Sequence, residues 1–279
     1  MRMTVYLNGA YLPKEEAHLS PDDRGFLFAD GIYEVVRSYG GTLFGLEPHL
    51  DRMADGLAAL RITGVDVAEL ATVCHELLKR NELDRSDALV YLQITRGAAP
   101  RTHFFPDPPT SPTVYATTMR FQPKGDPALG VKVITAPDQR WTRCDIKSVA
   151  LLPNCLAAQT AREAGVSEAL LVRDGVVLEG THTSFLAVID GVVRTAPLSN
   201  YILPSITRQA ALDLCERHGI PALPAPVFLH DLAAADELFL AGTTMEIMPI
   251  VEVDGHPVGS GNPGPVAARL LALFRKLTG

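Results

Sequence analysis

The stretch Arg143-Cys144-Asp145-Ile146-Lys147-Ser148 decides how this chain is interpreted, because two later segments complete it. Leu178-Glu179-Gly180 ends an apolar run, and Ile206-Thr207-Arg208 opens a helical pattern. A lysine amine forms an imine with an aldehyde, a carboxylate holds a pyridine nitrogen protonated, and a helix N-terminus attracts a phosphate. The ordered set therefore predicts a pyridoxal 5'-phosphate site.

Lys147 is the predicted catalytic residue. Most lysines lie at the surface, but this one is surrounded by residues that favour burial: Trp141, Cys144, Ile146, Val149, Leu151 and Leu152. Burial lowers the pKa of an amine and makes it a competent nucleophile. We therefore expect Lys147 to bind the cofactor covalently.

Four further positions are candidates for holding the cofactor. Glu179 either caps a turn or pairs with the protonated pyridine nitrogen, and Thr207 is either an ordinary N-cap or part of a phosphate site. Gly242-Thr243-Thr244 follows a predicted strand and offers a second place where backbone could approach a phosphate. Arg52 lies on a helix face and could supply a fixed positive charge, although surface arginines are common.

Two groups of residues suit substrate binding. Arg101 and His103 form a compact cationic pair on an irregular loop. A guanidinium there suits recognition of a substrate carboxylate. The alternative is a solvent-exposed loop with no binding role. Tyr33, Val35 and Arg37 are spaced two apart on one predicted strand, so they share a face. That face is more typical of a pocket wall than of a core.

Turn signals predict mainly antiparallel sheet. Each two-residue turn is flanked by β-branched or aromatic residues: Asn8-Gly9, Gly40-Gly41, Asp174-Gly175, Asp190-Gly191 and Asp254-Gly255. Apolar spacing predicts helices over 67–80 and 206–218 and a last helix beginning beside Pro265. The five prolines within 99–112 indicate an irregular loop.

Composition predicts two domains and excludes several classes of protein. The Pro- and Gly-containing segment 121–127 is the expected linker between a small N-terminal α/β domain (1–120) and a larger C-terminal cofactor-binding domain (128–279). The net charge of −7 with interspersed signs argues against a nucleic-acid partner. No apolar run approaches the roughly 20 residues of a membrane span.

The four cysteines are scattered without a C-x-x-C pair, and no histidine spacing is typical of a metal site. The first six residues lack the apolar core of a secretory signal. We therefore expect no metal, reduced thiols and a cytoplasmic location.

The chain resembles the fold-type IV pyridoxal-phosphate aminotransferases, and within them the D-amino acid branch. The resemblance spans almost the whole chain and is carried by these stretches: Asp23-Arg24-Gly25-Phe26, Phe28, Asp30-Gly31, Tyr33-Glu34-Val35-Val36, Pro48 to Arg52, Thr95-Arg96-Gly97, Pro100 to Pro106, Arg140-Trp141, Arg143 to Ser148, Glu179-Gly180, Ile206-Thr207-Arg208, Asp236 to Phe239 and Thr243 to Glu246.

The resemblance implies an α+β fold of two domains with antiparallel or mixed sheets and flanking helices, the larger C-terminal domain being β-barrel-like. It implies that Lys147 is the Schiff-base lysine and proton shuttle and that Glu179 is the pyridine partner. The phosphate would be held by Arg52, Ile206, Thr207, Gly242 and Thr243.

The substrate α-carboxylate would be bound by Tyr33, Arg101 and His103. The last two would come from a neighbouring subunit, so a homodimer with active sites at the interface is expected. Val35, Arg37, Thr183 and Thr244 would line the remainder of the substrate site.

Three positions depart from the family pattern. Ser184 stands where an asparagine is usual, Gly242 where the D-amino acid branch often has a serine, and Arg37 where it has a lysine. These changes leave the cofactor chemistry intact and bear on side-chain preference.

The resemblance thus implies ping-pong transamination between a D-amino acid, such as D-alanine or D-glutamate, and a 2-oxo acid, such as pyruvate or 2-oxoglutarate. A branched-chain L-amino acid aminotransferase and an aminodeoxychorismate lyase are alternatives with the same cofactor. A non-catalytic β-rich binding protein, in which Lys147 is structural, is an alternative from another class.

Overall fold

The computed structural model describes residues 2–278, which form two compact units. The N-terminal unit ends at Gln122 and also includes Ile146–Ala150. The C-terminal unit consists of Pro123–Asp145 and the described chain from Leu151 onward. The lysine segment is therefore built into the N-terminal unit, because Ile146 packs in that unit's core.

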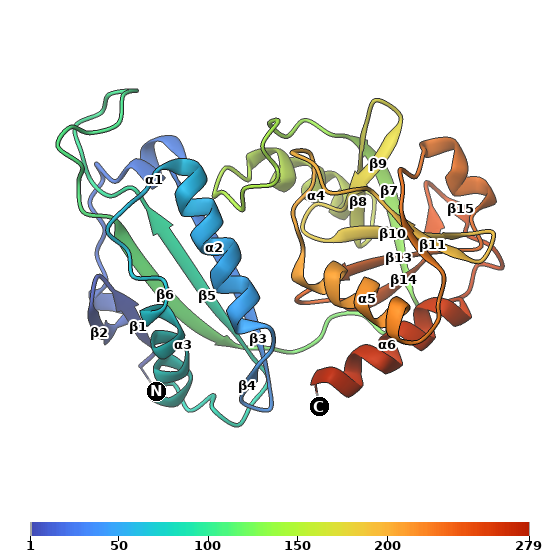
Figure 1. Cartoon of the computed structure of the whole chain (residues 1–279), viewed down its shortest axis with the longest axis horizontal. Helices are drawn as coiled ribbons and strands as arrows, with labels where there is room; N and C mark the ends of the chain where they lie inside the picture. The colour runs from blue at the N-terminus through green and yellow to red at the C-terminus, as the bar shows by residue number, and fades with distance from the viewer. Residues whose placement is uncertain (1, 279) are drawn as a thin grey trace. The chain divides into compact units, whose positions relative to one another are not determined.

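The N-terminal unit is an antiparallel sheet with the strand order β2-β1-β6-β5-β3-β4 (Figure 1). Its strands are β1 (Thr4–Leu7), β2 (Ala10–Pro13), β3 (Gly31–Tyr39), β4 (Thr42–Leu43), β5 (Ala88–Thr95) and β6 (Thr113–Arg120). Its helices are η1 (Lys14–Glu16), α1 (Arg24–Phe28), α2 (Leu46–Leu60) and α3 (Glu69–Arg80).

Helices α2 and α3 cover one face of this sheet. Alternate residues of β5, namely Ala88, Val90, Leu92 and Ile94, are fully buried on that face, as the period of two along a strand requires. Met53 of α2 and Leu77 of α3 join them in one apolar cluster.

The C-terminal unit is a mixed sheet that closes on itself. Its strand order is β12-β11-β10-β13-β14-β7-β8-β9, and a further pairing of β10 with β9 closes the ring. The strands are β7 (Val131–Pro137), β8 (Glu168–Arg173), β9 (Val176–Glu179), β10 (Ser184–Ile189), β11 (Val192–Thr195), β12 (Ala222–Pro224), β13 (Glu237–Gly242), β14 (Glu246–Val253) and β15 (His256–Pro257). The predicted barrel-like, mixed character is confirmed.

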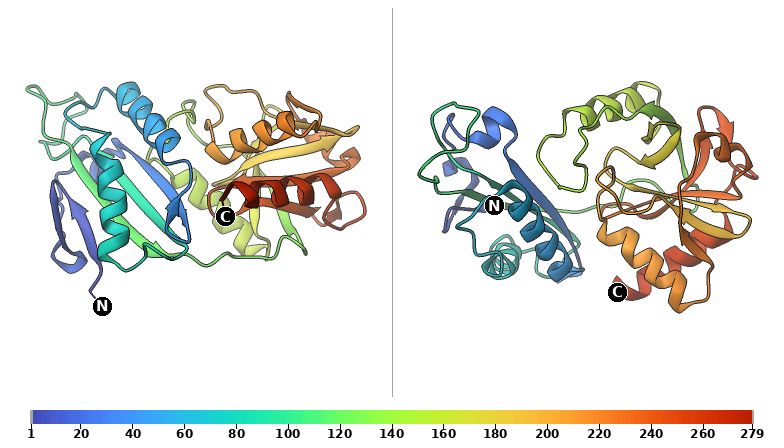
Figure 2. Two further views of the ribbon diagram at one scale, coloured as in Figure 1. Left: turned by 60° about the horizontal axis from the view of Figure 1, so that its bottom comes forward. Right: turned by 45° about the horizontal axis from the view of Figure 1, so that its top comes forward.

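Four helical segments flank this barrel: α4 (Leu152–Glu163), α5 (Ile206–Arg217), η2 (Leu229–Ala234) and α6 (Pro265–Thr278). Helices α5 and α6 lie side by side (Figure 2). Helix α4 packs its Ala157 and Ala161 against Ala169 and Leu171 of β8. Residues 2–278 contain no helix with the length and apolarity needed to cross a membrane.

The local expectations for strands and helices are confirmed with small shifts. All five predicted turns join antiparallel strand pairs. Helix α3 begins at Glu69 rather than at 67, because residues 67 and 68 form a tighter turn: the Leu70 N–H donates to the Val67 carbonyl at 3.2 Å and the Ala71 N–H to the Ala68 carbonyl at 3.3 Å. Helix α5 ends at Arg217, one residue early. The segment 99–112 contains neither helix nor strand.

Candidate active site

Lys147 is held against β3 by backbone hydrogen bonds. The Tyr33 N–H donates to the Lys147 carbonyl at 3.0 Å, and the Val149 N–H donates to the Gly31 carbonyl at 3.1 Å. The Lys147 Nζ lies 4.4 Å from the centroid of the Tyr33 ring. The predicted catalytic amine and one predicted substrate residue therefore lie together in the N-terminal unit.

A buried ion cluster occupies the face of β3 that is covered by α2. The fully buried Glu34 carboxylate accepts from Nε and Nη2 of Arg52, each at 2.7 Å. The same carboxylate lies 2.7 Å from Nδ1 of His49, which precedes Arg52 by one helical turn. These contacts fix the direction of the Arg52 guanidinium. The family resemblance predicts that this guanidinium binds the cofactor phosphate.

Ionisation within this cluster follows from burial and from the neighbouring charges. Burial alone would raise the pKa of Glu34, but Arg52 and His49 outweigh it and lower that pKa from 4.5 to about 2. Burial lowers the pKa of His49 despite its contact with Glu34, and the positive charges of Arg52 and Lys147 add to this. At neutral pH the cluster is a neutral imidazole beside a carboxylate-guanidinium pair.

The opposite face of β3 carries Tyr33, Val35 and Arg37. The Tyr33 ring stacks on Tyr91 of β5 with centroids 5.8 Å apart. The Arg37 guanidinium is buried beside Phe121, 4.4 Å from that ring's centroid. Arg37 lies about 13 Å along the strand from Tyr33, so the structure does not bring it to the lysine end of β3, and its substrate role stays a prediction.

Arg101 and His103 lie on the irregular loop and are both exposed. They converge on one aromatic ring, that of Phe28. The Arg101 guanidinium carbon is 5.1 Å from the Phe28 centroid, and the His103 ring is 5.6 Å from it. The predicted carboxylate-binding pair is therefore one local cluster.

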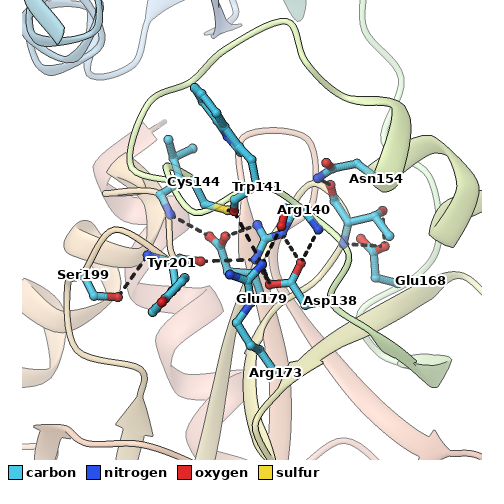
Figure 3. Close-up of polar contacts among 12 residues, drawn as sticks. Asp138, Arg140, Trp141, Cys144, Asn154, Glu168, Arg173, Glu179, Ser199 and Tyr201 are labelled. Atoms are coloured by element: carbon cyan, nitrogen blue, oxygen red, sulfur yellow. Dashed lines mark hydrogen bonds and ion pairs between the residues drawn. The ribbon is translucent and has the colours of Figure 1, made fainter.

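In the C-terminal unit, Glu179 is the last residue of β9 and is buried. Its Oε2 accepts from Nη1 of Arg140 at 2.6 Å (Figure 3). Its Oε1 accepts from the Leu203 N–H at 3.1 Å. Arg140 is in turn held by the Asp138 carboxylate at 2.9 Å, and Asp138 also pairs with Arg173 at 3.1 Å.

The ion pairs of this chain favour the charged forms of Arg140 and Asp138. Burial opposes the charge on Arg140, but hydrogen bonds and ion pairs with Asp138 and Glu179 outweigh it and raise the pKa of Arg140. Burial would raise the pKa of Asp138, and Arg140 and Arg173 lower it instead. The cationic Arg140 therefore holds the Glu179 side chain in a fixed orientation.

Helix α5 begins beside this group. Ser205 is its N-cap, and the Ser205 hydroxyl accepts from the Arg208 N–H at 3.2 Å. Ile206 and Thr207 occupy the first two helical positions, whose N–H groups have no acceptor within the helix. The Leu203 N–H that donates to Glu179 lies two residues before the N-cap. The predicted partner of the pyridine ring is therefore bonded to the chain segment that leads into the predicted phosphate site.

The loop after Glu179 is tied to a second buried carboxylate. Glu168 accepts from the hydroxyl and N–H of Thr181 and, at 3.2 Å, from the Thr183 hydroxyl. A Cβ at Gly180 would lie 2.2 Å from the Thr183 hydroxyl, so only glycine fits there.

The end of β13 packs on this loop. A Cβ at Gly242 would lie 3.3 Å from the Thr183 Cγ2, and the half-buried Thr243 and Thr244 follow directly. The Thr183 hydroxyl is occupied by Glu168, and its contact with substrate stays a prediction.

The residues of each unit fit the predicted cofactor. Glu179 is a buried, oriented carboxylate that suits a pyridinium N–H, and the start of α5 offers amides and a positive dipole end to a phosphate. Lys147 supplies an amine on a short, hydrogen-bonded segment.

The residues that orient these groups were not predicted from the sequence. Glu34 and Arg140 appear there only within the family resemblance, and His49, Asp138 and Glu168 have no predicted role. A glutamate directly beside apolar strand residues, before Ala169-Leu170-Leu171 at Glu168 and before Val35-Val36 at Glu34, is the signal that was available.

Comparison with known proteins agrees with this geometry. Residues 31–253 match the model of the amino-transferase class IV family. The chain is 42% identical to the D-alanine aminotransferase of Bacillus licheniformis over 95% of this chain and 93% of the relative. It is 38% identical to the D-alanine aminotransferase of Staphylococcus haemolyticus over 98% of this chain and 96% of that one.

Solved structures share the whole fold. The branched-chain aminotransferase of Thermoproteus uzoniensis, solved with norvaline, superposes with a TM-score of 0.89 at 25% identity, covering 99% of this chain and 94% of that one. The branched-chain amino acid aminotransferase of Escherichia coli gives a TM-score of 0.90 at 25% identity, covering 100% of this chain and 95% of that one.

Proposed function

This chain belongs to the amino-transferase class IV family, and we propose that it transfers an amino group between a D-amino acid and a 2-oxo acid with pyridoxal 5'-phosphate as cofactor. The observation that carries the substrate class is the 42% identity, over 95% of the chain, to a D-alanine aminotransferase. The two solved branched-chain aminotransferases share the fold at only 25% identity.

The cofactor would be held by residues that the structure orients. Lys147 would bind its aldehyde, Glu179 its ring nitrogen, and Ile206, Thr207 and Arg52 its phosphate, with Gly242 and Thr243 beside the phosphate. The bound cofactor supplies an electron sink for the electron pair left on the substrate Cα when its proton is removed. Glu179 would sustain that sink because its hydrogen bond with Arg140 fixes the orientation of its carboxyl group.

Lys147 would move the proton. Once the substrate amine has displaced it from the aldehyde, its Nζ would accept the proton from the substrate Cα as general base and donate it at C4′ of the cofactor as general acid. The backbone bonds of Ile146–Ala150 to β3 hold the lysine in place, and Tyr33 limits where the amine can swing.

Tyr33, Arg101 and His103 would bind the substrate α-carboxylate, with Arg101 and His103 supplied by a second copy in a homodimer. A guanidinium and an imidazole converging on one point suit a planar carboxylate. The clustering of both groups around Phe28 supports this assignment.

The test compares D-alanine with L-alanine, and then with L-leucine, as donors to 2-oxoglutarate. The proposal expects turnover with D-alanine, at least tenfold weaker turnover with the L-amino acids, and parallel double-reciprocal lines because the two half-reactions share one site. Preference for L-leucine would favour the branched-chain alternative. Pyruvate release from aminodeoxychorismate without an amino acceptor would favour the lyase.

A further inference from the structure

Two arginines share one buried carboxylate in the N-terminal unit. The Asp30 Oδ2 accepts from Nε of Arg24 at 2.8 Å and from Nε of Arg96 at 2.7 Å, and Arg96 Nη2 adds a bond to Oδ1 at 2.9 Å. The Arg24 and Arg96 side chains are only 4% and 8% exposed. Burial alone would raise the pKa of Asp30, and the two arginines lower it instead. Two cations on one anion leave a net positive cluster, which needs further acceptors.

Those acceptors are backbone carbonyls. Arg96 Nη1 and Nη2 donate to the Arg61 and Leu60 carbonyls at 3.1 and 2.7 Å, at the C-terminal end of α2, where such carbonyls lack helical partners. Arg24 uses its Nη1 differently: it donates to the Thr102 carbonyl at 2.7 Å.

Thr102 is the residue between Arg101 and His103. The Arg24 guanidinium thus anchors the backbone midway between the two side chains assigned to the substrate carboxylate. It also lies 4.7 Å from the Phe28 ring, around which Arg101 and His103 are arranged. The loop that follows β5 lies beside α1 (Figure 1), and the Ala99 N–H joins it to the Asp22 carbonyl at 3.2 Å.

We propose that Arg24, oriented by Asp30, is a positioning residue that holds Arg101 and His103 ready for the substrate carboxylate. The inference rests on the proposed function, because it concerns the carboxylate-binding pair. The segment 99–112 has no helix or strand, so without this anchor the backbone around Thr102 would have to be ordered at each binding event. Ordering on binding weakens affinity.

Arg24→Gln tests the inference in the full-length, cofactor-loaded enzyme. It removes the charge-assisted bond to Thr102, so KM for D-alanine and for 2-oxoglutarate should both rise by roughly tenfold or more, since both substrates carry the carboxylate. The change in kcat should be smaller, and the visible absorbance of the bound cofactor should be unchanged.

The matched control is Asn81→Ala. Asn81 is the C-cap of α3 and binds the N–H and carbonyl of Thr4 in β1, each at 2.8 Å, elsewhere in the N-terminal unit; these hydrogen-bond partners are not in the loop. Its loss should lower the melting temperature while leaving both KM values within about twofold. If Arg24→Gln shows the same pattern as Asn81→Ala, Arg24 is only structural and the inference is overturned.

A double-mutant cycle with Arg101→Ala separates positioning from a direct role. If Arg24 acts through Arg101 and His103, Arg24→Gln should raise KM much less in the Arg101→Ala background than in the wild type. An equal rise in both backgrounds, or no effect of Arg101→Ala on KM, overturns the inference.

Hydrogen exchange of residues 101–105 provides a readout that does not depend on turnover. Exchange in this segment should be faster in Arg24→Gln than in the wild type and in Asn81→Ala. Unchanged exchange contradicts the anchoring role. An inactive wild type would contradict the proposed function instead, and the exchange experiment would still decide whether Arg24 holds the loop.

Discussion

Breaking the buried ion pair of Glu34 and Arg52 should cost the protein several kcal/mol of stability. Glu34→Gln removes the anion and leaves the Arg52 guanidinium, with a side chain only 9% exposed, without its carboxylate. The lowering of the Glu34 pKa from 4.5 to about 2 corresponds to roughly 3 kcal/mol of stability at neutral pH. Breaking a buried pair by removing one partner typically costs about 3–5 kcal/mol, the same order.

The assay is thermal unfolding of the cofactor-free protein. Glu34→Gln should lower the melting temperature by roughly 6–12 °C at pH 7. The control is Glu76→Gln, because Glu76 pairs with Arg80 at 2.6 Å on the surface of α3, where such a pair contributes about 0.5 kcal/mol or less. Equal effects of the two substitutions would refute the reasoning.

Acid provides a second check of the same pair. A carboxyl group whose pKa is lowered by folding stabilises the protein fully above its unfolded pKa and loses that contribution as the pH falls through its folded pKa. The wild type should therefore lose stability between pH 4.5 and about 2 through Glu34. Glu34→Gln should lack this component, and the double variant Glu34→Gln/Arg52→Gln should recover part of the lost stability. A double variant less stable than the single one would contradict the account.

Three further outcomes are expected. Arg140→Met should weaken pyridoxal phosphate binding at least tenfold by fluorescence titration, because Glu179 loses the partner that orients it at 2.6 Å; unchanged affinity would exclude this role. Gly180→Ala should abolish activity and lower the melting temperature, since its Cβ would meet the Thr183 hydroxyl at 2.2 Å; a fully active variant would contradict the geometry. The lowered pKa of Asp138 should make the wild type lose stability as the pH falls below 3.8, and this loss should shrink in Arg140→Met; identical acid profiles would count against the pairing.

Turns and helix ends were predictable from the sequence, because they are determined by residues that are adjacent in the chain. Turns such as Asn8-Gly9 and Asp174-Gly175 form hairpins because both residues tolerate positive φ, and their strands follow at once. The stop of α5 near Gly219 follows the same local logic, since that glycine has φ of +63°.

The partners of buried charges were not predictable in this way. Arg140 meets Glu179, 39 residues further along the chain, because β7 and β9 both pair with β8, where Pro137 lies opposite Val172 and Glu179 opposite Leu171. Arg24 meets the Thr102 carbonyl across 78 residues, and a backbone acceptor has no sequence signature. Periodicity could show that Glu34 lies on a covered strand face, but it could not name His49 as its partner.

The covalent attachment of the cofactor to Lys147 is the most direct test of the account. The purified enzyme, loaded with pyridoxal phosphate, would be reduced with borohydride, digested and mapped by mass spectrometry. One pyridoxyl adduct is expected, on the peptide that contains Lys147, and none in Lys147→Ala. An adduct on another lysine, or no adduct in a protein that transaminates, would contradict this expectation.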